Sequence, residues 1–150
     1  MKTPAVEIRG LKKSFEDVQA LDGIDLTINQ GQFFGLLGPN GAGKTTIINI
    51  LTGLVIRQEG STKIFGQDTI KDYRFTRAKI GIAAQELSID WFFPIEKLLM
   101  FHAGYYGISK NLAQEKVADI IERLGLKEKR NTRLRQLSGG MKRRYQLAKA

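Results

Sequence analysis

The sequence contains no cysteine, only one histidine and only three prolines among its 150 residues. The absence of cysteine excludes disulfides, thiolate zinc sites and cysteine nucleophiles, so the fold must be stabilised by packing. No apolar run approaches the roughly 18 consecutive residues that a membrane-spanning helix needs. The first residues also lack the apolar centre of a secretory signal. We therefore expect the chain to stay in the cytoplasm.

What remains is the composition of an ordinary globular domain, with 42% hydrophobic and 26% charged residues. The net charge of +9 is unevenly distributed, because residues 101–150 carry 12 Lys and Arg against 4 Asp and Glu. Such a basic block indicates phosphates, nucleic acid or an anionic membrane surface as a partner. The alternative is a solvated face whose acidic counterpart lies elsewhere.

The first half of the sequence is typical of β-strands interrupted by one helix. Apolar residues at mostly alternating positions predict two antiparallel strands in the first thirty residues, with a turn at Asp22-Gly23. The nearly continuous apolar run over residues 33–37 predicts a central strand buried on both faces. The helix that follows is expected to stop at Gly53. Residues 61–65 and 80–84 predict two further strands.

From Pro94 onward the pattern becomes helical. It predicts one helix that ends near residues 104–107, and a second with Asn111 as N-cap and Gly125 as its stop. Residues 127–136 are expected to form a basic loop, and residues 141–150 a last helix. Because the sequence shows no repeat and no linker, we expect a single folding unit with an α-rich insertion.

The most specific pattern lies between the predicted central strand and its helix. Residues 38–45 fit G-x-x-x-x-G-K-S/T in the strand–loop–helix context that this motif requires. Its glycines let backbone N–H groups surround phosphate oxygens, and the helix N-terminus adds its positive end. Lys44 would supply a full charge to the β- and γ-phosphates, and Thr45 a hydroxyl ligand for Mg²⁺. The residues predicted to bind phosphate are Gly38, Pro39, Asn40, Gly41, Ala42, Gly43, Lys44, Thr45 and Thr46.

A second pattern, Leu137-Ser138-Gly139-Gly140-Met141, precedes a basic amphipathic helix. Alone it predicts a helix cap, in which Ser138 caps the N-terminus and the glycines leave N–H groups open to an anion. Together with the phosphate motif, it closely resembles the ATP-binding cassette (ABC) transporter ATPases. The resemblance implies that Ser138, Gly139 and Gly140 form the signature motif, which closes over the γ-phosphate of ATP held by a second copy of the subunit.

Further residues match the order of landmarks in that family. Gln85 falls where the family has the Gln of its Q-loop, which implies a catalytic residue that contacts Mg²⁺ and the attacking water. Phe15 resembles the aromatic residue that stacks on adenine; the alternative is a buried Phe at a strand end. The run Trp91-Phe92-Phe93-Pro94 would line the groove for a membrane partner, or belong to the core of the helical insertion.

The resemblance implies an α/β fold: a P-loop NTPase sheet core with an antiparallel β-subdomain and a helical subdomain. Residues 1–84 would form the nucleotide-binding core and β-subdomain, residues 85–140 the Q-loop and helical subdomain, and residues 141–150 the start of the helix after the signature motif. Residues 103–107 and 140–144 resemble ATPase subunits of ABC-2-type exporters. The expected partners are an ABC-2-type permease, at the inner face of the cell membrane, and a second copy of the chain.

The basic block would then face anionic lipid or the permease. Nucleic acid is not expected, because no aromatic stacking platform interleaves with these charges. In the resembled family the Walker B strand, with its catalytic Glu, and the switch His follow the signature helix. No apolar run here ends in paired acids, and His102, the only histidine, is expected to be an ordinary helix residue.

We therefore expect a fold truncated before the Walker B strand and a chain that binds Mg·ATP but does not hydrolyse it alone, because phosphoryl transfer depends on positioned charge. Two alternatives stay open. One is a fragment that binds ATP and never turns it over. The other is a P-loop kinase or GTPase, which would leave Ser138 and Gln85 unexplained.

Overall fold

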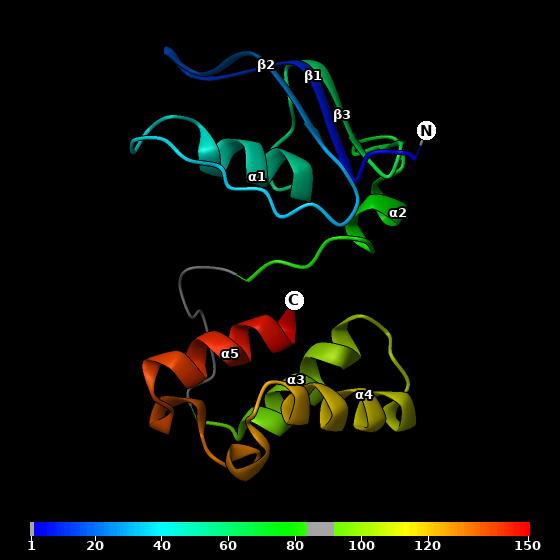
Figure 1. The fold of residues 1–150 in the computed structure, drawn as a ribbon, viewed down its shortest axis with the longest axis vertical. Coiled ribbons are helices and arrows are strands. Elements are labelled where there is room, and N and C mark those ends of the chain that lie inside the picture. Colours follow the sequence, from blue (N-terminus) through cyan, green and yellow to red (C-terminus); the bar gives the residue numbers. More distant parts are fainter. Residues whose placement is uncertain (1, 84–91) are drawn as a thin grey trace. The chain divides into compact units, whose positions relative to one another are not determined.

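The computed structural model describes residues 2–83 and 92–150. The chain forms two compact units, Met1–Ile80 and Gly81–Ala150, where the sequence predicted one (Figure 1). The first unit is built on strands and the second on helices. In these two described ranges, no helix is long and apolar enough to cross a membrane.

The first unit contains a four-stranded antiparallel sheet in the order β2-β1-β3-β4. The predicted pair of N-terminal strands and the strand near residues 61–65 are confirmed. The four strands are β1 (Val6–Phe15), β2 (Val18–Ile28), β3 (Glu59–Ile64) and β4 (Gln67–Asp68).

The predicted turn at Asp22-Gly23 is wrong. The chain reverses between β1 and β2 at Glu16, whose φ is 49°. Gly23 lies inside β2 with a φ of 71°, next to a shift in the pairing register of the two strands. The Asp-Gly pair therefore belongs to a β-bulge, which needs the same left-handed backbone that a tight turn would have needed.

Helix α1 (Lys44–Thr52) packs against the sheet. Its Ile47 and Ile50 are buried in one cluster with Ile8, Leu11 and Leu21 of the strands. Gly53 ends the helix in the left-handed conformation that the sequence predicted, with a φ of 76°. The polar segment after β4 contains the short helix α2 (Tyr73–Arg77).

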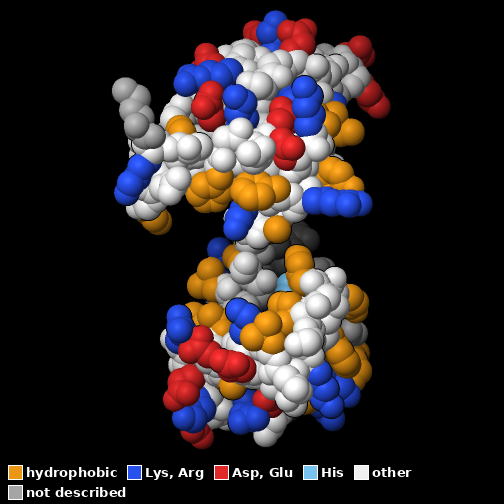
Figure 2. Space-filling view, turned by 90° about the vertical axis from the view of Figure 1, so that its right-hand side faces the viewer, with side chains coloured by type: hydrophobic (Ala, Val, Ile, Leu, Met, Phe, Trp, Pro, Cys, Tyr) orange, Lys and Arg blue, Asp and Glu red, His pale blue; other side chains and the backbone are white. Residues whose placement is uncertain are grey.

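Residues 33–37 do not form the predicted central strand. Phe33 and Leu37 are 99% and 92% exposed. Residues 80–83 form no strand either, and Ala84 lies outside the described residues. A central strand needs a hydrogen-bonded neighbour on each side, and in the described part of the chain β1 to β4 pair only with one another. Hydrophobic side chains consequently remain at the surface of the first unit (Figure 2).

The second unit packs three helices around a core that includes Leu99, Val117, Ile121 and Tyr145. The helices are α3 (Ile95–Tyr105), α4 (Lys110–Arg123) and α5 (Gly139–Lys149), with short 3-10 turns η1 (Lys127–Lys129) and η2 (Leu134–Gln136) between the last two. The three predicted helices are confirmed. The N-cap of α4 is Ser109 rather than Asn111, which lies inside the helix.

Candidate nucleotide site

The phosphate loop, residues 38–45, runs into the N-terminus of α1. Gly43 takes the N-cap position with a φ of 79°, and no side chain caps the helix. Within the residues that the structure describes, the backbone N–H groups of Gly41, Gly43 and Thr45 donate to no other atom of the chain. Unpaired amides at a helix N-terminus provide both donors and positive potential for an anion.

Strand β2 packs closely against Gly43. It is buried, and a Cβ at this position would lie 2.5 Å from Leu21 Cδ2 and 2.6 Å from the Ala20 carbonyl oxygen. Only a glycine fits this approach, so β2 determines where the loop enters the helix. Sequence reasoning missed Ala20 and Leu21 as positioning residues, because no motif marks a contact between segments so far apart in the chain.

Lys44 is folded over its own loop. Its ammonium group donates to the carbonyl oxygens of Gly38, at 2.7 Å, and Pro39, at 2.5 Å. An ammonium has three donors, so one is left to an incoming phosphate even with both carbonyl contacts in place. The ammonium group of Lys44 therefore lies against the loop that the sequence predicts to bind phosphate.

Thr45 is exposed in the first turn of α1 and Thr46 is half-buried. The described ranges contain no group of three His, Cys, Asp or Glu side chains that could hold a metal ion. Mg²⁺ does not require such a cage, because it usually keeps several waters and is bound through substrate phosphates and one or two protein ligands. An exposed hydroxyl beside a phosphate-binding loop fits that donor set.

The segment Ser138-Gly139-Gly140 begins helix α5 in the second unit. Ser138 is its N-cap, as predicted, and its Oγ accepts a hydrogen bond from the Met141 N–H at 3.3 Å. A Cβ at Gly139 or Gly140 would meet no atom within 4 Å, and neither glycine has a positive φ. The backbone would therefore accept another residue here, and the two glycines leave open space above a helix N-terminus.

Helix α5 is anchored in the core of its unit by Tyr145. This side chain is only 2% exposed, and burial raises the pKa of its phenol to about 12. Arg144 donates to the carbonyl oxygens of Leu124, at 2.9 Å, and Gly125, at 3.2 Å, at the end of α4. The segment that carries Ser138 is thus fixed to α4 from behind.

His102 lies on α3, with Nε2 3.1 Å from the Lys149 carbonyl oxygen. Burial and the nearby Lys149 charge lower its pKa. Its ring also packs edge-on against Tyr106, with centroids 5.1 Å apart. These contacts give His102 a packing role between α3 and α5.

Phe15 ends β1 and is 44% exposed, so it is not the buried strand-end residue of the alternative interpretation. The Lys13 ammonium lies 5.0 Å from its ring centroid. Phe15 and the phosphate loop belong to the first unit, whereas Ser138, Gly139 and Gly140 belong to the second. Gln85 lies outside the described residues.

The two described aromatic residues of the run before Pro94 differ in burial. Phe93 packs against the core of the second unit and meets Phe101 edge-on, at 5.8 Å. Phe92 is 67% exposed, with the Arg135 guanidinium 5.8 Å from its ring. Trp91 lies outside the described residues.

Several cations of the basic block have partners inside the unit. Lys127 pairs with Glu122 at 2.8 Å and Arg130 with Glu96 at 2.6 Å. Arg143 donates to Gln146 at 3.2 Å. Some of the basic side chains therefore form ion pairs or hydrogen bonds within the second unit.

Comparison with known proteins identifies the family to which the chain belongs. The family described as "ABC transporter" matches residues 21–150. The chain is 37% identical over 150 residues to "Nod factor export ATP-binding protein I" of Rhizobium sp. (strain N33), covering 100% of this chain and 49% of that protein. The protein of the same name from Paraburkholderia xenovorans (strain LB400) is 35% identical over 150 residues, which again cover 100% of this chain and 49% of that protein. The chain thus spans about half the length of the curated relatives it matches.

Solved structures show the same fold at lower identity. The ATP-binding subunit of an ABC transporter superposes with a TM-score of 0.81 at 21% identity, covering 97% of this chain and 61% of its own. The protein cbiO1 from Clostridium perfringens, part of the ABC transporter complex cbiONQ, superposes with a TM-score of 0.86 at 23% identity, covering 99% and 61%. The α/β fold class is thereby confirmed.

Proposed function

Because the chain belongs to the ABC transporter family, we propose that it forms the nucleotide-binding part of an ATPase subunit that drives an ABC-2-type exporter. The observation that supports this most directly is the phosphate loop. It combines unpaired backbone N–H groups at the start of α1 with the ammonium group of Lys44 over the same loop.

In this proposal residues 38–46 hold the phosphates of ATP. The amides near Gly41 and Gly43 donate to phosphate oxygens, and Lys44 neutralises the β- and γ-phosphates. Thr45 offers its hydroxyl to Mg²⁺, which would spread the charge of the terminal phosphates. Phe15 stacks on the adenine, since its ring is partly exposed at the end of β1. Gln85 would contact the metal and the attacking water.

The second unit contributes to a nucleotide held by another copy of the chain. At the N-terminus of α5, the N–H groups of Ser138, Gly139 and Gly140 have no acceptor among the residues that the structure describes, and the serine side chain lies beside them. These groups suit a γ-phosphate that arrives from outside the chain, because no Cβ blocks the approach. Two copies arranged head to tail would then enclose two nucleotides.

An exporter is favoured by the names of the relatives, which are described as export ATP-binding proteins. The membrane partner would be an ABC-2-type permease, and the subunit would act at the inner face of the cell membrane. Exposed Phe92, beside the predicted Q-loop, is a candidate contact for that partner. The cycle proposed for the whole protein is ATP-driven closure of the dimer followed by hydrolysis. The described residues alone would bind ATP without turnover.

Competition binding tests which nucleotide the site prefers. We expect a labelled ATP analogue with Mg²⁺ to be displaced by ATP at concentrations at which GTP has little effect. A clear preference for GTP would contradict the family assignment of the site and favour the GTPase interpretation.

A double variant, Gly139→Ala with Gly140→Ala, tests the second unit. The backbone at both sites accepts a Cβ without contact, so the fold is expected to persist while the added methyl groups obstruct the partner's nucleotide. We expect dimerisation induced by a non-hydrolysable ATP analogue, measured by light scattering, to be lost. Gly104→Ala on α3, another glycine with open space around it, is the matched control. Unchanged dimerisation in the double variant would reject the proposed role.

A further inference from the structure

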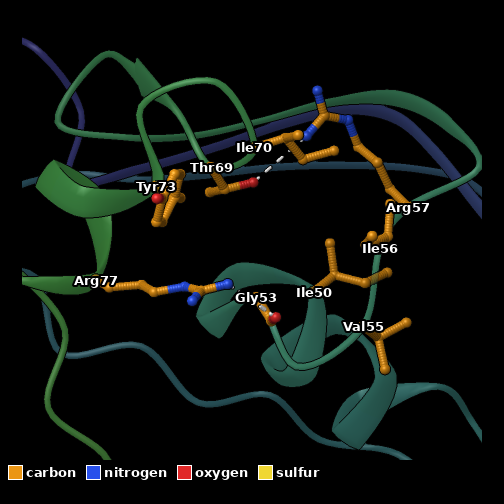
Figure 3. A pocket seen from close by; sticks show the side chains of 9 residues that line it. All are labelled: Ile50, Gly53, Val55, Ile56, Arg57, Thr69, Ile70, Tyr73 and Arg77. Atoms are coloured by element: carbon orange, nitrogen blue, oxygen red, sulfur yellow. Dashed lines mark hydrogen bonds between the residues drawn. The ribbon is translucent and has the colours of Figure 1, made fainter.

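A hollow of about 240 Å³ lies in the first unit, at the end of α1 opposite to the phosphate loop. It is open on one side and lined by the C-terminal part of α1, the segment before β3 and residues from the end of β4 through α2 (Figure 3). An apolar cavity of roughly 150 Å³ accepts benzene, whereas drug-sized ligands need roughly 300–1,000 Å³. The hollow is therefore suited to one ring or branched chain with a small polar group.

The base of the hollow is apolar. Ile50, on α1, is 2% exposed, and Val55 lies beside it. Ile56 and Ile70 extend the apolar wall to the surface, where they are 69% and 44% exposed. Tyr73 closes one side with its aromatic ring (Figure 3). This lining favours an apolar body that turns its other end outward.

The opening is positively charged. The Arg77 side chain runs along the edge of the hollow toward Gly53 (Figure 3), and one of its Nη atoms donates to the Gly53 carbonyl oxygen at 3.1 Å. The guanidinium groups of Arg77 and Arg74 lie 5.3 Å and 5.8 Å from the Tyr73 ring centroid. Neither arginine has a carboxylate partner among the residues for which the structure gives positions.

The other arginine on the wall already uses four of its five donors. Arg57 pairs with Asp68 at 2.7 Å and donates to the Gly60 carbonyl oxygen and to the hydroxyls of Thr62 and Thr69. It therefore acts as a fixed part of the wall. Arg77 uses only one of its five donors within the described chain, and a guanidinium fork matches the two oxygens of a carboxylate.

We propose that this hollow binds a small amphipathic carboxylate, with its aromatic or branched aliphatic group on Ile50 and its carboxylate on Arg77. The site is separate from the phosphate loop, since the two lie at opposite ends of α1. It requires no covalent step and no contact with the nucleotide. The inference is independent of the proposed export function.

The test uses the protein at its full natural length, labelled at the isoleucine δ1 methyl groups, with 3-phenylpropionate as the probe. We expect saturable shifts of the Ile50, Ile56 and Ile70 methyl signals, while those of Ile8 and Ile121, buried elsewhere, stay in place. The neutral analogue 3-phenylpropionamide is expected to bind at least about tenfold more weakly. Equal affinities, or no shift up to about 10 mM probe, would overturn the proposal.

Arg77→Gln is expected to bring the affinity for the carboxylate down to that for the amide. Arg9→Gln, which removes an exposed arginine of β1, is the matched control and is expected to leave the affinity unchanged. If Arg77→Gln does not fold, Ile56→Glu at the exposed rim decides, because its carboxylate would repel the probe by about tenfold or more in affinity. An undiminished preference for the carboxylate in either folded variant would refute the site.

Discussion

Two glycine-containing segments lead into helix N-termini, and they use their glycines for different reasons. In the phosphate loop, Gly41 and Gly43 have φ values of 85° and 79°, and Gly43 is closely approached by β2. Before α5, Gly139 and Gly140 have no positive φ and open space around them. The first pair is required by the fold of the chain itself, whereas the second pair leaves room for something outside it.

The caps differ in the same sense. The start of α1 has no side-chain cap, and its cation is turned back onto the loop. Helix α5 is capped by Ser138 and fixed through Tyr145. The start of α1 therefore lacks the stabilisation that a side-chain cap provides, whereas the start of α5 has it.

The largest effect is expected for Gly43→Ala. The left-handed φ costs about 1–2 kcal/mol for a residue with a Cβ, and contact with Leu21 and the Ala20 carbonyl adds about 1–3 kcal/mol. We expect the free energy of unfolding, measured with urea, to fall by about 2–5 kcal/mol. Gly41→Ala, which meets no atom within 4 Å, is the control and is expected to lose only the conformational part. Equal losses would show that β2 does not position the loop.

Lys44→Ala is expected to weaken ATP binding while the fold is retained. A hydrogen bond to a charged group is worth about 1.5–3 kcal/mol, so the dissociation constant measured by calorimetry should rise about 10- to 100-fold. Lys79→Ala, at an exposed site after α2, is the charge-matched control. An unaltered dissociation constant would reject Lys44 as a phosphate ligand.

Raising the pH is expected to weaken the anchor of α5. The pKa of Tyr145 is about 12 in the folded chain and 10 for an ordinary tyrosine, so the folded state holds the proton more tightly. The stability that this provides is complete below pH 10 and is lost between pH 10 and 12, by about 2–3 kcal/mol. Urea unfolding across this range should show that the free energy of unfolding falls with rising pH. Tyr145→Phe should make this slope less steep. An equal slope in the variant would assign it to other groups.

The smallest effect is expected for Ser138→Ala, which removes the side-chain cap of α5. Losing such a cap costs about 1 kcal/mol, whereas Ser138→Gly costs only a few tenths. The loss of stability in each variant, relative to the unaltered chain, is read from thermal unfolding. An unaltered stability in Ser138→Ala would mean that the contact with the Met141 N–H contributes nothing.

Elements with local signals could be predicted from the sequence. Helix α1 follows a phosphate motif and stops at Gly53, and α5 begins at Ser138, because capping depends on neighbouring residues. The bulge at Gly23 was mistaken for a turn, since both require a left-handed residue. Residues 33–37 have strand composition but no strand to pair with in the described part of the chain, and pairing is not a local property.

In the candidate site, too, the local features could be predicted from the sequence and the contacts between distant segments could not. Its proposed phosphate-binding residues follow from a motif, because phosphate binding needs consecutive amides in one short segment. The support of Gly43 by Leu21 and the position of Arg77 at Gly53 join distant segments, and no spacing in the sequence predicts them. The role of Gln85 stays a prediction.

The two carbonyl contacts of Lys44 would enter the balance of the proposed phosphate binding. Two of the three ammonium donors go to the carbonyl oxygens of Gly38 and Pro39, so a phosphate would meet the third directly and compete for the other two. The measured affinity is therefore a difference between two sets of partners. A variant that shifts the carbonyl oxygens of Gly38 or Pro39 would change that difference through the side chain of Lys44.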